Sequence, residues 1–145
     1  MKNVLVLTVL MGVFLTSKAQ INLDSIALNK KRNVPVTQFG VASFYADKFE
    51  GQRTCTDEIF TQKRLTAACN TLPLNCWIKV TNLRNKKSVK VWINDRMHPS
   101  NPRLIDMSKS AAVALGYTGH GLTRVKITYL GKKKPEEEVF AASNK

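Results

Sequence analysis

The stretch "NDRMHP", residues 94–99, gathers a carboxylate, a guanidinium and an imidazole within six positions. It follows directly on residues 88–93, where apolar side chains recur at every second position. The two-residue period of a strand puts Asp95 on the same face as these apolar side chains. Asp95 then ends a core strand at a partly dry rim, where desolvation favours the protonated carboxyl that a general acid requires. The alternative is a structural carboxylate that accepts backbone hydrogen bonds in a turn closed by Pro99.

The polar residues beside Asp95 allow two interpretations each. Arg96 points away from Asp95 and could anchor the loop or a substrate acid. His98 could supply a titrating imidazole, or it could be an exposed loop residue. His120, between Gly119 and Gly121, is predicted to be a loop residue.

Three cysteines, Cys55, Cys69 and Cys76, allow at most one internal disulfide. Their separations do not match the close cysteine pairs of a zinc site, so the sequence predicts no metal. A cysteine nucleophile is disfavoured because no Cys/His/Asn signature accompanies these residues. The residues alone leave the pairing open. We favour a Cys55–Cys76 bridge with one buried free thiol.

Short strands separated by polar turns should position these residues, and their spacing is typical of a small barrel. The residues 83–88, "LRNKKS", predict a hairpin turn. One helix should interrupt the strands over residues 109–115, with Ser108 as its N-cap and Gly116 as the left-handed residue that ends it. The fold class is mainly β, and the expected strands are 39–46, 65–69, 77–83, 88–94 and 122–130.

The N-terminus resembles a secretory signal peptide, with Lys2 before an apolar run at residues 4–15 and a small-x-small pattern ending at Ala19. Cleavage near Ala19 would deliver the protein to the periplasm or the exterior. The apolar run is shorter than the roughly 20 residues of a membrane span. Because Gln20 stands where a lipoprotein signal needs cysteine, we expect no membrane anchor.

The remaining residues suit a single domain. We expect a leader at 20–37, a barrel domain at 38–131 and a charged tail at 132–145. Without Lys2 and Lys18, the chain has 21 basic and 10 acidic residues, or about +11. This charge serves solubility and favours an anionic wall or membrane surface as a partner. Nucleic acid is not expected, because no recognition helix or ribonucleoprotein motif is present.

A set of separate motifs appears in one order along the chain: "GVASFY", a Thr and Glu before an aromatic, "LTAA" with "TLP", "VTNL", "NDR", "IDMS" and "G-x-G-x-x-R-V". Together they span residues 39–127, and in this order the chain resembles the rare lipoprotein A family. The resemblance implies a six-stranded double-psi β-barrel with one short helix, related to expansins and barwin. It also implies a lytic transglycosylase that cuts peptidoglycan glycan strands at a septal or other wall site and leaves 1,6-anhydro ends.

The resemblance assigns roles to individual positions. Asp95 matches the family's acid/base Asp, and Glu58 matches its loop Glu, which would assist Asp95. From composition alone, Glu58 could equally be a solvent-exposed loop glutamate. Thr61 and Cys69 replace an Asp and a His of the family, and His98 could restore the lost imidazole. We expect five residues to contact substrate: Thr61, Cys69, His98, Arg96 and Tyr45. The other aromatics, Phe44, Trp77 and Trp92, could stack on sugar rings as well, but aromatics on strands are more often core residues, and we predict that role for them. Asp106 could line the groove.

Three function classes are compatible with these residues. An enzyme needs only one acid/base, because the sugar's own 6-hydroxyl replaces water as the attacking group. An expansin-like module that grips wall glycan without cutting it is favoured by the losses at Thr61 and Cys69. An interaction protein at the division site is a third, weaker reading. We expect a monomer that uses no cofactor.

Overall fold

The computed structural model describes residues 26–27 and 36–136. The expected signal peptide and nearly all of the expected leader lie outside this part of the chain. The strands are β1 (Thr37–Phe44), β2 (Thr66–Ala68), β3 (Cys76–Asn82), β4 (Ser88–Asp95), β5 (Ile105–Met107) and β6 (Thr123–Gly131). A short 3-10 helix, η1 (Asp47–Phe49), follows β1, and α2 (Lys109–Leu115) precedes β6.

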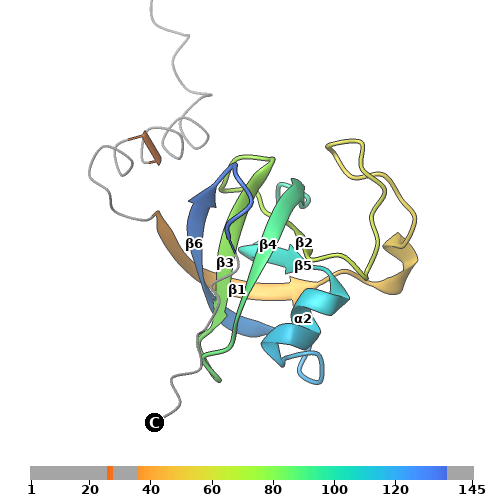
Figure 1. Cartoon of the computed structure of the whole chain (residues 1–145). Helices are drawn as coiled ribbons and strands as arrows, with labels where there is room; N and C mark the ends of the chain where they lie inside the picture. Colours follow the sequence, from red (N-terminus) through yellow and green to blue (C-terminus); the bar gives the residue numbers. More distant parts are fainter. Residues whose placement is uncertain (1–25, 28–35, 137–145) are drawn as a thin grey trace, which may run out of the picture.

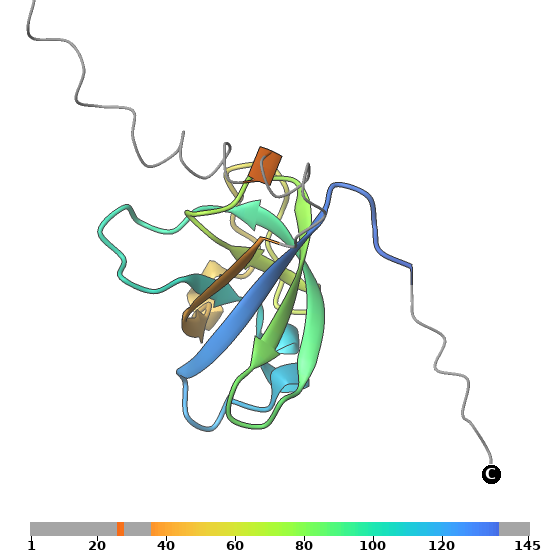
Figure 2. The same cartoon turned by 90° about the vertical axis from the view of Figure 1, so that its left-hand side faces the viewer.

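The six strands close into a barrel in the order β1-β5-β2-β4-β3-β6 (Figures 1 and 2). Two pairs, β1 with β5 and β2 with β4, are parallel, and the other four are antiparallel. Closure joins β1 to β6 over six residue pairs, from Thr37 opposite Thr128 to Ala42 opposite Thr123. The predicted six-stranded barrel with one helix is therefore confirmed.

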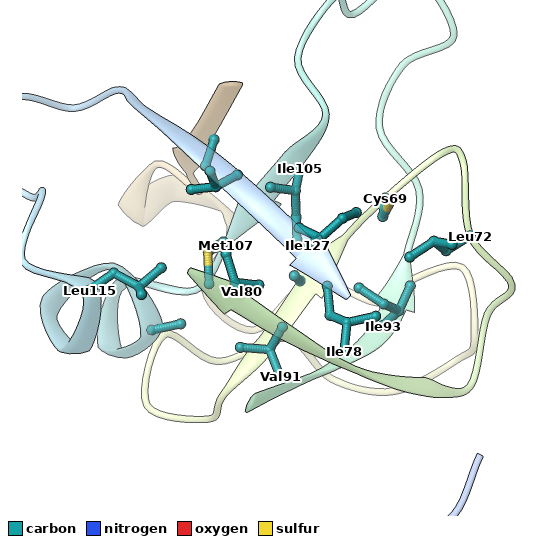
Figure 3. Close-up of a cluster of buried hydrophobic side chains, with 14 of the residues drawn as sticks. Cys69, Leu72, Ile78, Val80, Val91, Ile93, Ile105, Met107, Leu115 and Ile127 are labelled. Atoms are coloured by element: carbon teal, nitrogen blue, oxygen red, sulfur yellow. The ribbon is translucent and has the colours of Figure 1, made fainter. Parts of the chain in front are cut away.

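Alternating side chains of the strands fill the barrel with a core of fully buried aliphatic residues (Figure 3). Ile78, Val91 and Ile93 are each 0% exposed. Leu115 of α2 lies at one end of this cluster and Cys69 at the other. Gly40 on β1 is required by close packing, because a Cβ there would stand 2.5 Å from Cβ of Leu104.

The helix forms as its capping residues predict. The Ser108 side chain accepts a hydrogen bond from the backbone N–H of Ala111, and Gly116 ends the helix with φ of 71°. The hairpin between β3 and β4 is also confirmed, since the backbone N–H of Asn82 donates to the carbonyl of Lys87 and the Asn82 carbonyl accepts from the N–H of Lys86. In the described residues, no helix is both long enough and apolar enough to cross a membrane.

Candidate functional site

Asp95 is the last residue of β4, at a point where the strand is irregular. Ala67 of β2 pairs with Ile93 and Ala68 pairs with Asp95, so Asn94 is an additional residue on β4. Such a bulge interrupts the regular alternation and re-aims side chains at the end of a strand. Asn94 is consequently buried, whereas the sequence placed it on the face opposite the core. Asp95 is half-buried at the rim.

Three donors hold the Asp95 carboxylate. The Tyr45 hydroxyl donates to Oδ2 over 2.9 Å, and the backbone N–H groups of Cys55 and Arg96 donate to Oδ1 over 3.0 and 2.9 Å. Hydrogen bonds to a charged acceptor are roughly twice as strong as those between neutral groups. The carboxylate therefore has a fixed orientation, which a group that transfers a proton needs.

Tyr45 connects this carboxylate to the aromatic side chains beneath it. Its ring packs against Phe60 and Phe49, with centroids 4.3 and 5.7 Å away. Burial raises the pKa of Tyr45 strongly, and the negative charge of Asp95 adds to the shift. The hydroxyl therefore keeps its proton at neutral pH and remains able to donate to Asp95. Asp106 also contributes to this shift and accepts hydrogen bonds from Ser43 and Arg103.

The Glu58 carboxylate has its own set of hydrogen-bond donors, distinct from those of Asp95. Its Oε1 accepts from Trp92 Nε1 and Thr56 Oγ1, and its Oε2 accepts from Asn94 Nδ2 and Arg64 Nη1, all over 3.3 Å. Within the described residues no hydrogen bond joins Glu58 to Asp95 itself. The connection between them is the loop itself. Cys55 lies three residues before Glu58, and its backbone N–H donates to the Asp95 carboxylate.

A groove of about 750 Å³ opens beside Glu58. Trp77 and Trp92 line it together with lysines from β4 and from the segment that follows β6. Asp95 and Tyr45 are not among its lining residues, and the contact of Tyr45 with substrate stays a prediction. Tyr45 supports Asp95 at the neighbouring rim.

The two tryptophans lie outside the core, contrary to the sequence prediction. They face each other across β3 and β4, with ring centroids 5.4 Å apart, and both are half-buried. The alternation of residues contained the signal, since Trp92 shares its face with Lys90 rather than with buried Val91 and Ile93. The prediction holds for Phe44, which packs against the core and against Tyr117.

Arg96 anchors a loop. Its Nη1 donates to the backbone carbonyls of Cys69 and Leu72, the latter over 2.6 Å. These bonds tie the end of β4 to the loop that follows β2. The sequence left two roles open for Arg96, a loop anchor and a contact with a substrate acid. Its hydrogen bonds in the structure support the loop anchor.

The backbone N–H of Cys69 donates to the backbone carbonyl of Asp95 over 3.1 Å, but in the described residues no side chain of Cys69, Thr61 or His98 bonds to the Asp95 carboxylate. Cys69 is 0% exposed and belongs to the core, so its predicted contact with substrate is wrong. Thr61 lies in a turn where its carbonyl accepts from the N–H of Arg64. His98 is exposed in the β4–β5 loop, and its Nδ1 lies 2.6 Å from Oγ of Ser100. This exposure agrees with the interpretation of His98 as a loop residue, and its role in restoring the imidazole stays a prediction.

The three thiols are free, which contradicts the expected Cys55–Cys76 bridge. Cys55 is exposed in the loop beside Asp95, and its Sγ faces the carbonyl of Asn94. Cys76 is fully buried at the start of β3, where its Sγ donates to the carbonyl of Pro73 over 3.1 Å. The two side chains thus have separate partners in separate environments.

Alkylation should modify Cys55 alone in the folded protein. Burial raises the pKa of Cys76 to about 12, and its thiol is inaccessible. Burial and then the negative charge of Asp95 raise the pKa of Cys55. Asp95→Asn removes that charge, so we expect Cys55 to react about two- to fivefold faster at pH 8 because more of it is thiolate. Mass spectrometry after timed iodoacetamide treatment measures this rate, and an unchanged rate would contradict the contact.

Comparisons with known proteins agree with this fold. A protein-family model described as lytic transglycolase matches residues 24–127. The chain is 46% identical over 105 residues to the endolytic peptidoglycan transglycosylase RlpA of Rickettsia bellii, covering 69% of this chain and 46% of that protein. It is 40% identical over 123 residues to the protein of the same name from Rickettsia felis, covering 75% of this chain and 54% of the relative.

Solved structures share the barrel at low sequence identity. The Streptomyces papain inhibitor superposes with a TM-score of 0.54 at 16% identity, covering 66% of this chain and 94% of that one. An expansin of Clavibacter michiganensis superposes with a TM-score of 0.52 at 18% identity, covering 70% of this chain and 53% of the expansin. The matched part is about half the length of the Rickettsia relatives.

Proposed function

The chain belongs to the RlpA-like lytic transglycosylase family of double-psi β-barrels, and from this premise we propose that it cleaves the glycan strands of peptidoglycan. The observation that carries the proposal is the half-buried Asp95 carboxylate, oriented at the barrel rim by Tyr45 and two backbone amides. A single oriented carboxyl group meets the demand of this chemistry.

Asp95 acts first as the acid and then as the base. Its protonated carboxyl gives a proton to the glycosidic oxygen as the bond from that oxygen to the anomeric carbon breaks. The resulting carboxylate is stabilised by the three donors that surround it. It then takes the proton of the sugar's 6-hydroxyl as that oxygen bonds to the anomeric carbon. The product has a 1,6-anhydro end, and Asp95 is protonated again.

Glu58 assists by holding the loop and the strand end together rather than by transferring a proton. Its four donors come from the loop itself, from Arg64 and from Trp92 and Asn94 of β4. Because the same loop presents the Cys55 N–H to Asp95, a displaced Glu58 would disturb the acid. Glu58 is thus proposed as a positioning residue.

Digestion of purified sacculi tests the proposal. Mass spectrometry should find 1,6-anhydro ends in the soluble products of the wild type. A protein that sediments with sacculi and releases none of these products would support a non-catalytic glycan-binding module instead. That second candidate is favoured by one observation, that the groove is lined by Glu58 and the tryptophans but not by Asp95.

Tyr45→Phe should lower the cleavage rate about 10- to 100-fold, since it removes one hydrogen bond to the carboxylate formed by proton transfer. The ring still packs on Phe49 and Phe60, so stability should change by less than about 1 kcal/mol. Initial rates of product release across pH 4–8, with urea unfolding alongside, separate the two effects. A rate equal to that of the wild type throughout this range would exclude Tyr45 from positioning Asp95.

Export forms part of the proposal, because the substrate lies outside the cytoplasm. The signal-peptide pattern ending at Ala19 supports it. An N-terminus at Gln20 in protein recovered from the periplasm or medium is the expected result.

A further inference from the structure

The groove beside Glu58 has an aromatic wall built by two adjacent strands. Trp77 of β3 and Trp92 of β4 are direct cross-strand partners, and their rings are inclined by 52°. Both line the groove while their neighbours Ile78, Val91 and Ile93 fill the core. Amphipathic aromatic rings of this kind bind ligands that offer apolar faces and polar edges. A sugar ring has both.

The rim of the groove carries excess positive charge. Lys90, Lys132 and Lys134 line it, as does Arg64. The single carboxylate among the lining residues, Glu58, is paired with Arg64 over 3.3 Å. Lys90 Nζ donates to the backbone carbonyl of Glu136 over 2.9 Å, which leaves its charge in place. The three lysines thus give the groove a net positive charge. A neutral glycan would not use this charge, whereas a sugar that bears a carboxylate would.

The size and place of the groove fit a part of a longer polymer. About 750 Å³ lies within the range of roughly 300–1,000 Å³ typical of ligand pockets. Glu58 lines the groove, and the loop that carries it also contacts Asp95 through Cys55. A strand seated on the tryptophans can therefore continue past this loop toward Asp95.

We propose that the Trp77–Trp92 groove is a binding subsite for an acidic sugar of the glycan strand, with the ring on the tryptophans and its carboxylate at the lysines. This inference rests on the proposed function, because it takes its ligand from the polymer that Asp95 is proposed to cut. It adds a subsite that holds the strand beside the acid.

Intrinsic fluorescence measures the occupancy of this groove directly, because Trp77 and Trp92 are the two tryptophans of the chain. The full-length Asp95→Asn protein is titrated so that nothing is cleaved. The probes are an alternating N-acetylglucosamine–N-acetylmuramic acid tetrasaccharide with free lactyl carboxylates and the neutral N-acetylglucosamine tetrasaccharide. We expect a saturable change with both and about tenfold tighter binding of the acidic probe. Added NaCl should weaken the binding of the acidic probe and leave the binding of the neutral probe unchanged.

Matched variants assign the two contributions. Lys90→Ala combined with Lys132→Ala should reduce the preference for the acidic probe to less than about threefold, whereas Lys126→Ala on β6, outside the groove, should preserve it. Trp77→Ala should weaken both probes at least about tenfold, and Trp77→Phe should restore most of the affinity. Circular dichroism confirms that each variant is folded.

Two results would overturn the subsite: no fluorescence change with either probe at millimolar concentration, or equal affinities that the lysine variants leave unaltered. The proposed cleavage fails separately. A wild type that binds the acidic probe but releases no 1,6-anhydro products keeps the subsite and loses the enzyme. A wild type that cleaves sacculi without any fluorescence response keeps the enzyme and loses the subsite.

Discussion

Asp95→Asn should reduce the release of 1,6-anhydro products by about 10²- to 10⁴-fold, the usual contribution of a general acid or base. The amide cannot give a proton to the glycosidic oxygen or take one from the 6-hydroxyl. Its geometry can nevertheless be kept, because Oδ1 can still accept from Cys55 and Arg96 while the new NH₂ group donates to the Tyr45 oxygen. The unfolding free energy should therefore change by less than about 1 kcal/mol.

The same chain offers a closely matched control for this substitution. Asp57 lies in the same loop, is exposed and has φ of 63°, a region that Asn adopts as readily as Asp. Asp57→Asn removes an equal charge near the site and should retain full activity. Glu58→Gln should lower activity less than Asp95→Asn does. If Glu58→Gln abolished cleavage while Asp95→Asn left it intact, the acid would have to be reassigned to Glu58.

Arg96→Ala should destabilise the protein by about 2–4 kcal/mol, because it removes two hydrogen bonds from a charged donor to the carbonyls of Cys69 and Leu72. Both carbonyls belong to the loop that joins β2 to β3. Urea unfolding monitored by tryptophan fluorescence measures the loss. Arg96→Lys should recover only part of it, since an ammonium lacks the planar fork of the guanidinium.

Arg124→Ala is the control for lost cationic charge, because Arg124 is exposed on β6. It should change stability by less than about 0.5 kcal/mol. One combination of results would instead make Arg96 a substrate contact. If Arg96→Ala left stability unchanged and instead raised KM for the glycan, Arg96 would be a substrate contact and not a loop anchor.

The strands and the helix were predictable because local rules determine them. The expected strands 39–46 and 122–130 lie within two residues of the observed bounds of β1 and β6, and the caps at Ser108 and Gly116 fixed the helix. Residue periodicity did not reveal β5, whereas the equally short β2 was expected within residues 65–69. The existence of β5 depends on pairing with β1 and β2, which tertiary structure alone brings together.

The rim position of Asp95 was predictable, whereas its surroundings were not. Asp95 could be identified because it ends an apolar strand within a recognisable motif. The bulge at Asn94 could not, because it arises from the register between β2 and β4. The thiol environments are likewise set by packing: the loop exposes Cys55, while the barrel encloses Cys69 and Cys76. The spacing of residues in the sequence does not predict the bulge or the burial of the individual cysteines.

Closure of the barrel between β1 and β6 has a consequence for folding kinetics. The two strands that meet there are the first and last along the chain, and Thr37 pairs with Thr128. Contacts between such distant positions cost loop entropy before they return any stability, so this topology folds slowly for its size. Since β6 is also paired with β3, a nascent polypeptide that lacks this strand leaves both β1 and β3 with an open edge. Ribosomal synthesis of almost the entire domain must therefore precede its first native, closed state.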